Sequence, residues 1–420
     1  MSKILLISYN FHPINTPHSQ KWTVLLKLLA KKYQIDVICS ARQNLPEFEK
    51  FEGINIYRVK NPINQTRELS KIESGPEKNS RKSNKKFLIS SLKKIHDLTW
   101  KKVYFPDFSI FWYLSAKKKA EYLMEEKRYS NVITVSFPFT PHLIGLMLKK
   151  NYSFKWHVEI GDPFYLADKN PFNNQKIYGK LNFNLDKIIF EKADNLYFYP
   201  EVRGDYEEIF PFIKEKSTNI PIMLFDSRAK LGKSKENETK EFLYIGTLNK
   251  RIRNPEYLLK LFDLVENNYK ETEFKITFIG NLSDCTDIVS KYKTIFGNKM
   301  EIIPPIPKEE VKKYLGRADV LVNIGNDSKY QLPSKLIEYI STGKTILNIV
   351  SNENDTSRTF LKKYKKVLNI ETSINMQKNI ELLYQVINDR EEIHLNDEDI
   401  EKMINIHRPE QILKLYKFKY

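Results

Sequence analysis

Cysteine is scarce in this sequence of 420 residues, which contains only Cys39 and Cys285. Two thiols so far apart exclude a disulfide-stapled scaffold, and neither stands at the spacing of a metal-binding motif. The sequence also lacks any run of about 18 apolar residues, the length that a membrane-spanning helix requires. The short apolar stretch at residues 4–8 predicts a buried first strand and is too short for a signal peptide. We therefore expect a protein of a reducing compartment, the cytoplasm.

Glycine-rich phosphate-binding motifs are absent as well. The sequence has no G-x-G-x-x-G pattern and no Walker loop, which excludes the usual dinucleotide-dependent oxidoreductases and the P-loop ATPases. A chain of 420 residues exceeds one typical core and fits two domains, and its hydrophobic content of 41% is sufficient to build both.

The formal net charge of +17 is concentrated in one part of the chain. Residues 60–130 hold 17 Lys or Arg against 8 Asp or Glu, a net of +9. Within this region, residues 87–100 combine an apolar stripe at helical spacing with flanking lysines, a pattern typical of a helix lying on anionic lipid. A solvated basic helix packed on its own domain is the alternative. Lysine outnumbers arginine here and no nucleic-acid-binding motif accompanies it, so we expect no nucleic-acid partner.

Strand-like apolar runs alternate with helical patterns along most of the sequence. In the first half, strands are expected at 4–8, 35–39, 54–59, 132–135, 156–160 and 195–199. In the second half, strands are expected at 241–246, 274–280, 300–303, 319–323 and 344–350. This alternation predicts an α/β protein with two doubly wound, Rossmann-like parallel sheets.

The alternation lapses once, in a polar stretch rich in Lys, Glu, Asn and Ser. We therefore predict an N-terminal domain over residues 1–224, a linker over 225–240, a C-terminal domain over 241–395 and a C-terminal helical segment over 396–420. The triplet Asp397-Glu398-Asp399 fits a D-x-D metal motif. Because it follows Asn396 and precedes a helical pattern, we interpret it as helix capping and expect no essential metal.

The most informative stretch lies at residues 332–350. Pro333 suits the first turn of a helix, and Gly343 suits a helix end before the apolar strand pattern. The helix would open toward the carboxyl ends of the second sheet, with unpaired N–H groups that can hold a phosphate. Glu338 follows within the helix, and a carboxylate can accept both hydroxyls of a ribose. The stretch predicts a nucleotide site, with an ordinary helix start and a solvated Glu338 as the alternative.

The run from Pro333 to Tyr339, followed by Gly343 and Lys344, resembles the donor-site signature of retaining GT-B glycosyltransferases of glycosyltransferase family 4. The similarity is strongest to members that build bacterial capsule and O-antigen chains. It implies two Rossmann-like domains facing across a cleft, and a C-terminal helix that returns to the first domain. It also implies that Glu338 holds the ribose of a nucleotide sugar.

The resemblance extends to the residues that precede this helix. We expect backbone N–H groups around Lys329 to Ser334 to hold the diphosphate. Lys335 would add a cation, with a solvent-facing side chain as the alternative. Family members often carry a second Glu eight positions before the ribose-binding one. This chain has Tyr330 there, and the nearest carboxylate is that of Asp327.

A basic turn follows the first strand of the second domain and begins at Gly246. A strand, a basic turn and then a helix form a good seat for an anion. Fixed cations in it would stabilise the negative charge of a departing diphosphate without a metal ion. In many family members an Arg follows the Gly directly, whereas this chain has Thr247. The resemblance then implies a displaced arginine, for which we favour Arg253 over Arg251 and Lys250, with a solvated basic turn as the alternative.

In the first domain, residues 11–22 resemble the first loop and helix of the family, and a helical pattern covers 21–32. The segments 104–112 and 136–146 extend the similarity. His18 and Lys21 thereby become candidate residues of the acceptor pocket, with surface positions as the alternative. Family members commonly place glycines in this loop, and this chain has none there.

The stretch 156–164 resembles the Asp-Pro-Trp strand end of capsule-type members. Asp162 is expected just past the carboxyl end of a strand, where it would orient or deprotonate the acceptor hydroxyl. Glu159 is the second candidate for this role. An Asp162 that only caps a helix or turn is the alternative.

Together these features predict a metal-independent glycosyltransferase that needs no cofactor. It would transfer a sugar from a nucleoside diphosphate sugar to a lipid-linked saccharide in capsule or O-antigen synthesis, with retention of anomeric configuration. We expect it to act on the anionic inner face of the plasma membrane as a peripheral protein. Two alternatives remain: a non-catalytic GT-B homologue that acts as a partner, and a nucleotide-sugar epimerase, which needs no lipid acceptor.

Overall fold

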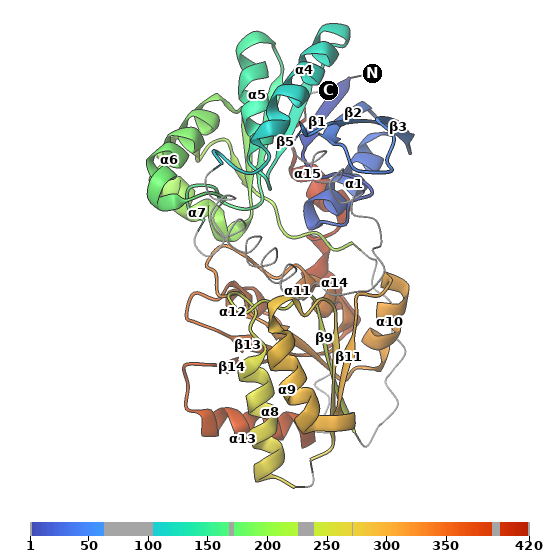
Figure 1. The fold of residues 1–420 in the computed structure, drawn as a ribbon, viewed down its shortest axis with the longest axis vertical. Coiled ribbons are helices and arrows are strands. Elements are labelled where there is room, and N and C mark those ends of the chain that lie inside the picture. The colour runs from blue at the N-terminus through green and yellow to red at the C-terminus, as the bar shows by residue number, and fades with distance from the viewer. Residues whose placement is uncertain are drawn as a thin grey trace, which may run out of the picture. The chain divides into compact units, whose positions relative to one another are not determined.

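The computed structural model describes residues 2–62, 104–167, 172–225, 239–270, 272–388 and 395–418. The chain divides into two compact units: unit 1 comprises Met1–Pro221 with Ile412–Tyr420, and unit 2 comprises Ile222–Gln411. Each unit contains one sheet with helices packed on it (Figure 1). The basic stripe predicted at 87–100 lies outside the described residues, as do residues 226–238 of the predicted linker.

The sheet of unit 1 has eight strands in the order β3-β4-β2-β1-β5-β6-β7-β8. The strands are β1 Lys3–Ser8, β2 Gln34–Ser40, β3 Phe48–Phe51, β4 Ile54–Val59, β5 Asn131–Val135, β6 Lys155–Ile160, β7 Asn195–Phe198 and β8 Ser217–Asn219. Neighbouring strands are parallel, except that β3 pairs with β4 in an antiparallel hairpin. The sequence pattern missed β3, because this edge strand is half exposed and has no buried run.

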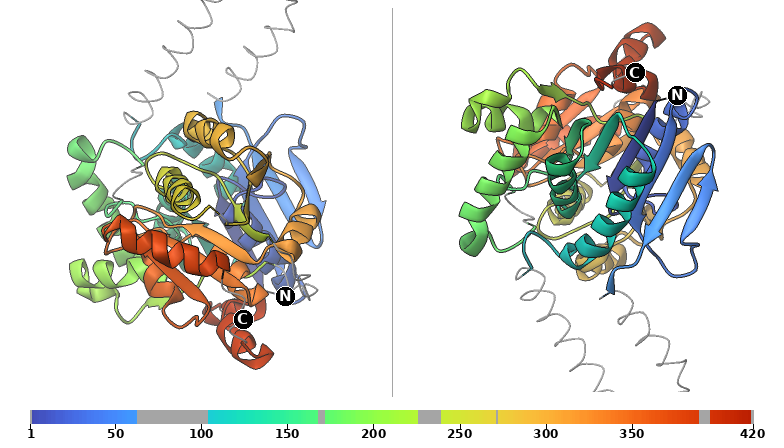
Figure 2. Two further views of the ribbon diagram at one scale, coloured as in Figure 1. Left: turned by 90° about the horizontal axis from the view of Figure 1, so that it is seen from below. Right: turned by 90° about the horizontal axis from the view of Figure 1, so that it is seen from above.

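The helices of unit 1 are α1 Pro17–Leu29, α4 Tyr113–Glu126, α5 Thr140–Asn151, α6 Gln175–Lys192 and α7 Pro200–Ile209, and α15 Pro409–Leu415 crosses the boundary between the units along the chain. Figure 2 shows α4 and α5 beside the strands that they cover, with α4 packed on β2 and β4 and α5 on β1, β5 and β6. Helix α1 begins earlier than the expected 21–32. The Thr16 side chain accepts a hydrogen bond from Ser19 N (3.2 Å), and Pro17 stands in the first turn, so both residues start the helix there.

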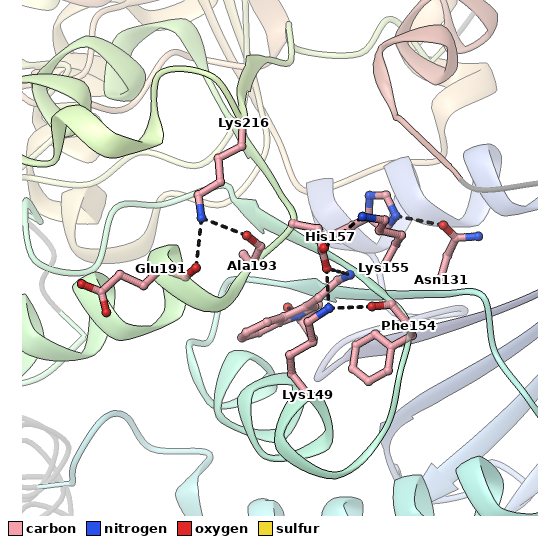
Figure 3. A network of polar contacts seen from close by, with 11 residues as sticks. Asn131, Lys149, Phe154, Lys155, His157, Glu191, Ala193 and Lys216 are labelled. Carbon is pink, nitrogen blue, oxygen red and sulfur yellow. Dashed lines mark hydrogen bonds and ion pairs between the residues drawn. The ribbon is translucent and has the colours of Figure 1, made fainter.

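Polar contacts fix β6 between its neighbours at the amino ends of the strands (Figure 3). Lys149 at the end of α5 donates to the carbonyl of Phe154 (2.6 Å) and to Asp194 (2.6 Å), which also accepts from Trp156 N (2.8 Å). His157 bridges β5 and β7 through Asn131 (3.0 Å) and Tyr197 (3.1 Å). Burial lowers the pKa of His157 to about 3, so the bridge is neutral at pH 7. This network holds the strand order at the end of the sheet opposite to Glu159 and Asp162.

The sheet of unit 2 is fully parallel, with six strands in the order β11-β10-β9-β12-β13-β14. The strands are β9 Lys240–Ile245, β10 Phe274–Ile279, β11 Met300–Ile303, β12 Val320–Ile324, β13 Thr345–Val350 and β14 Val367–Glu371. The helices are α8 Glu256–Asn268, α9 Thr286–Phe296, α10 Lys308–Arg317, α11 Lys335–Thr342, α12 Thr356–Leu361, α13 Met376–Asn388 and α14 Asp397–Asn405. Helix α8 packs against α9 and α13, and α11 packs against α14. The predicted pair of doubly wound sheets is thus confirmed.

A ladder of three asparagines, two of them buried, crosses three strands of unit 2. Asn323, Asn348 and Asn369 stand in register on β12, β13 and β14. The Asn323 side chain donates to Asn348 (2.7 Å), and Asn348 donates to Asn369 (2.8 Å). Ser357 of α12 donates a further hydrogen bond to Asn348 (3.0 Å). The amides therefore satisfy one another inside an otherwise apolar sheet.

Within the described ranges, every helix is too short or too polar to cross a lipid bilayer.

Candidate functional site

Unit 1 gathers ionisable side chains at the carboxyl ends of its central strands. His18 and Lys21 come from the first turns of α1, the helix that follows β1 after a loop over residues 9–16. Glu159 is the penultimate residue of β6, and Asp162 follows two residues after the strand. Because β1 and β6 both run parallel to β5, their carboxyl ends meet at one edge of the sheet. The predicted residues of the first domain therefore come together.

Lys21 and Glu159 form a buried ion pair at the centre of this group. Lys21 Nζ lies 3.1 Å from Glu159 Oε1, and each side chain is only 3% exposed. The hydroxyl of Tyr416 donates to the second carboxylate oxygen of Glu159. Lys21 Nζ also lies 5.4 Å from the ring centre of Tyr199 and 5.9 Å from that of Tyr416. Two aromatic rings and one carboxylate thus surround the ammonium group.

His18 lies between the two carboxylates nominated from the sequence. Its Nδ1 is 3.9 Å from Glu159 Oε1, and its Nε2 is 4.0 Å from Asp162 Oδ2. Gly161 makes this position possible, since a Cβ atom there would stand 2.0 Å from the imidazole ring. Burial lowers the pKa of His18, although Asp162 and Glu159 oppose the shift. A neutral imidazole at pH 7 can accept a proton.

Exposure separates the roles of Glu159 and Asp162. The Asp162 side chain is 32% exposed, whereas Glu159 is enclosed by Lys21 and Tyr416. Burial lowers the pKa of Lys21, against the effect of Glu159. It raises the pKa of Tyr416 well above its usual value, with Glu159 acting in the same direction. A substrate hydroxyl can therefore reach Asp162, while Glu159 holds the cluster together.

The sequence interpretation missed Tyr199 and Tyr416 in this cluster. Tyr199 follows β7, and its position could have been inferred from the end of that strand. Tyr416 lies 257 residues from its partner Glu159, and sequence spacing gives no signal for such a contact. The only hint was the expected return of the C-terminal helix to the first domain, and Ile412–Tyr420 do belong to unit 1.

Unit 2 places the predicted donor residues around the start of α11. The helix begins at Lys335 with Ser334 as its N-cap, and it ends at Gly343, whose φ of 72° is the left-handed conformation that glycine favours. Pro333 therefore precedes the N-cap, and its expected place in the first helical turn is wrong by two residues. Lys335 and Glu338 pair at 2.6 Å across this first turn.

Arg253 is tied to the loop that leads into α11. Its Nε donates to Asn326 Oδ1 (2.6 Å), and the amide of Asn326 donates to the carbonyl of Gln331 (2.6 Å). Two backbone hydrogen bonds with Asn249 close the turn that carries Arg253 (2.8 and 3.2 Å). Burial raises the pKa of Tyr244 to about 12, against the effect of the neighbouring Arg253. The guanidinium is thus held at the carboxyl end of β9.

The other basic residues of this turn point elsewhere. Lys250 pairs with Asp287 of α9 (2.7 Å), and Arg251 is exposed. Thr247 is exposed too, and its carbonyl accepts a hydrogen bond from the hydroxyl of Tyr244 (3.2 Å). Gly246 has a φ of 154°, and its carbonyl would lie 2.1 Å from a Cβ atom on Gly280. The two adjacent strand ends can approach this closely because Gly280 has no Cβ atom.

Asp327, the carboxylate nearest to the start of α11 in the preceding loop, takes part in hydrogen bonds through its side chain and its backbone. Asp327 accepts a hydrogen bond from the side chain of Asn352 (2.7 Å), and its N–H donates to Ile252 O (3.1 Å).

Asp397–Asp399 lie in the first turn of α14, where the side chain of Asn396 accepts from Asp399 N (2.7 Å), as predicted for a capped helix. In the part of the chain that the structure describes, no three His, Cys, Asp or Glu side chains gather in a group that could hold a metal ion.

Comparisons with known proteins agree with this architecture. The family model described as glycosyl transferases group 1 matches residues 226–403. Sucrose-phosphate synthase from Thermosynechococcus elongatus is 14% identical, with a TM-score of 0.65 over 99% of this chain and 97% of that chain. The Anabaena protein HepE, solved with UDP, is 9% identical, with a TM-score of 0.63 over 98% and 97%. WaaG, a glycosyltransferase involved in lipopolysaccharide biosynthesis, is 10% identical, with a TM-score of 0.61 over 99% and 99%.

No curated protein sequence matches the chain. The solved structures are similar in fold over nearly the whole chain, and the family match covers most of unit 2. The chain therefore has the GT-B fold, and its residues 226–403 match the glycosyl transferases group 1 family.

Proposed function

We propose that this protein is a metal-independent glycosyltransferase that moves a sugar from a nucleoside diphosphate sugar to a lipid-linked saccharide. Unit 2 is the donor-binding part and unit 1 the acceptor-binding part. The reaction retains the anomeric configuration and serves the synthesis of a capsule or O-antigen polysaccharide at the inner face of the plasma membrane. The group 1 match to unit 2 and the solved structures of HepE with UDP and UDP-glucose support a nucleotide sugar as donor.

One observation carries the proposal: Glu338 and Arg253 lie in the same unit at the carboxyl ends of its strands. Glu338 stands in the first turn of α11, where a carboxylate can accept ribose hydroxyls beside a phosphate held by backbone N–H groups. Arg253 is fixed through Asn326 to the loop before this helix. Its permanent charge would stabilise the diphosphate as it leaves. The Lys335–Glu338 pair opens when the ribose takes the carboxylate.

On the acceptor side, we assign the orientation of the acceptor hydroxyl to Asp162, since it is the more exposed of the two candidate carboxylates. His18 lies beside it and supports its position. Glu159 acts as a positioning residue within the buried cluster. The net charge of +17 and the occurrence of WaaG, which is involved in lipopolysaccharide biosynthesis, among the structural neighbours favour a lipid-linked acceptor at an anionic membrane.

Thermal shift against a panel of UDP-, GDP- and dTDP-sugars tests the donor assignment. A ligand at about 100 times its dissociation constant stabilises the folded protein by about 2.7 kcal/mol, which is easily detected. Removing the charged partner with Glu338→Ala should weaken binding of the identified donor by about 1.5–3 kcal/mol. Glu310→Ala, which removes an exposed Glu from the first turn of α10, is the matched control and should leave binding unchanged.

The outcomes separate the proposal from its alternatives. Equal donor affinity in wild type and Glu338→Ala would contradict the proposed site. No binding to any member of the panel would favour the non-catalytic partner, whereas slow donor hydrolysis without acceptor would argue against it. Conversion of the donor into its epimer without any lipid acceptor would identify the nucleotide-sugar epimerase.

A further inference from the structure

Unit 2 contains a cavity that the proposed donor site does not use. Its volume is about 750 Å³, within the range of sites for small organic ligands. Helices α11, α12 and α14 and the segment after α12 line it. From α11 it receives Ile337 and Ile340, which project from a different side of the helix than Glu338, since successive residues turn by about 100°.

The inner lining of this cavity is apolar. Phe360 and Met403 join Ile337 and Ile340 in the lining. Ile406, also in the lining, is 58% exposed and is among the most exposed large aliphatic side chains of the described residues. An apolar wall that ends in an exposed isoleucine favours a ligand with a hydrocarbon part.

The rim of the cavity is basic. Lys362, Lys363 and Lys365 all line it, and within the described ranges none of the three forms an ion pair. Lys402 also lines it and pairs with Glu398 (2.8 Å) on the exposed side of α14. One carboxylate, that of Asp399, faces these four lysines in the lining. The excess positive charge favours an anionic group at the mouth of the cavity.

The lysines are held at the rim by their buried neighbours. Leu361 and Tyr364 are 0% and 2% exposed, and they alternate with the three exposed lysines along the chain. The hydroxyl of Tyr364 donates to the carbonyl of Lys344 (2.6 Å), which anchors the segment beside the start of β13. The segment that carries the basic rim is therefore anchored to unit 2, the unit that also provides the apolar wall.

We propose that this cavity binds a lipid phosphate, an amphiphile with one phosphate head and a hydrocarbon chain. The phosphate lies among Lys362, Lys363 and Lys365, and the chain lies on Ile340, Met403 and Ile406. A free phosphate would leave the apolar wall unused, and an uncharged alcohol would leave the lysines unused. The site is separate from Glu338 and Arg253, so the proposal does not depend on the function proposed for them.

Isothermal titration calorimetry on the full chain tests this site with decyl phosphate, kept below its micelle concentration. Decan-1-ol and inorganic phosphate serve as probes that lack the charge and the chain respectively. Decyl phosphate should bind saturably at one site and at least tenfold more tightly than either. The variant Lys362→Gln/Lys363→Gln/Lys365→Gln and the variant Met403→Glu should each weaken it at least tenfold.

A second triple variant, Lys260→Gln/Lys270→Gln/Lys313→Gln, removes the same charge from exposed positions of unit 2 outside the cavity and should bind like wild type. Circular dichroism verifies that each variant is folded. Equal losses in the two triple variants would show a non-specific charge effect and overturn the proposal. Absence of saturable binding, or equally tight binding of decan-1-ol or inorganic phosphate, would overturn it as well. None of these readouts involves a nucleotide sugar, so failure here leaves the donor site untouched.

Discussion

Unit 1 and unit 2 carry different kinds of candidate functional groups at the carboxyl ends of their strands. In unit 1 the candidate residues are ionisable side chains that contact one another: Lys21 and Glu159 are buried and His18 is partly buried, and burial lowers the pKa of Lys21 and of His18. In unit 2 the candidate groups are backbone N–H groups at a helix start, Glu338 in the first turn of that helix, and an arginine, which keeps its charge at any ordinary pH. Unit 1 thus contains the groups whose pKa is changed by burial, and unit 2 contains the groups suited to holding an anion.

Tryptophan fluorescence can follow the unfolding of unit 1 separately from that of unit 2. All four tryptophans, Trp22, Trp100, Trp112 and Trp156, belong to the unit 1 part of the chain. Urea unfolding followed by fluorescence therefore reports the free energy of unfolding of unit 1.

The largest expected effect comes from breaking the buried ion pair. Glu159→Ala leaves the buried amino group of Lys21 without its carboxylate, which should lower the free energy of unfolding of unit 1 by about 3–5 kcal/mol. The double variant Lys21→Met/Glu159→Gln removes both charges and keeps an acceptor for Tyr416, so it should recover most of this loss. Single and double variants with equal losses would show that the cost comes from packing rather than from an unpaired charge.

The second effect concerns the pH dependence of unit 1. Burial raises the pKa of Asp186 on α6 to about 7, although Tyr206 and the N–H of Tyr165 donate hydrogen bonds to it. The folded state then holds a proton that the unfolded chain loses near pH 3.8. The Asp186 carboxyl therefore adds to the free energy of unfolding at low pH, and this stabilisation is lost as the pH rises to about 7. Between pH 5 and pH 7, wild type should lose about 2–3 kcal/mol of stability relative to Asp186→Asn.

Fluorescence-monitored urea unfolding at several pH values measures that difference. The buried histidines titrate in both proteins and cancel when the two are compared. Asp355→Asn, a change of the buried carboxyl that caps α12 in unit 2, is the control and should leave the fluorescence transition at its wild-type pH dependence. A difference between wild type and Asp186→Asn that stays constant with pH would contradict the raised pKa.

The smallest effect distinguishes two arginines of unit 2. Arg253→Ala should weaken binding of the nucleoside diphosphate by about 1–2 kcal/mol, because it removes a fixed cation beside α11. Arg251→Ala removes an exposed cation from the same turn and should change the affinity much less. Calorimetric titration of both variants with the nucleotide found in the donor panel measures the difference, and equal losses would contradict the assignment to Arg253.

Much of the architecture could be predicted from the sequence because buried parallel strands are continuous apolar runs. The stretches around Ile4, Val132 and Ile346 are examples, and each lies at the centre of its sheet or next to it. The elements that were missed have no such run. Strand β3 is a half-exposed edge, and β14 has a single buried residue among partly buried ones.

The candidate site was predictable only in part. Helix starts and strand ends can be read locally, which brought Glu338, Arg253 and Asp162 to the correct edges of their sheets. The contact between Glu159 and Tyr416 could not be found in this way, because Tyr416 comes from the far end of the chain. The contact between Lys335 and Glu338 was also not foreseen, although the two residues stand three apart on one helix.

The asparagine ladder of unit 2 has a consequence for how its sheet assembles. Strands β12 and β13 are apolar on both faces, so hydrophobic burial alone distinguishes poorly between the native pairing and one shifted along the strand. A shift by two residues would even keep each side chain on its own face, and it would place Asn348 opposite Leu321 or Gly325. Each amide left without a partner in the interior costs about 1–3 kcal/mol. The ladder therefore favours the native strand register over shifted registers while the sheet is forming.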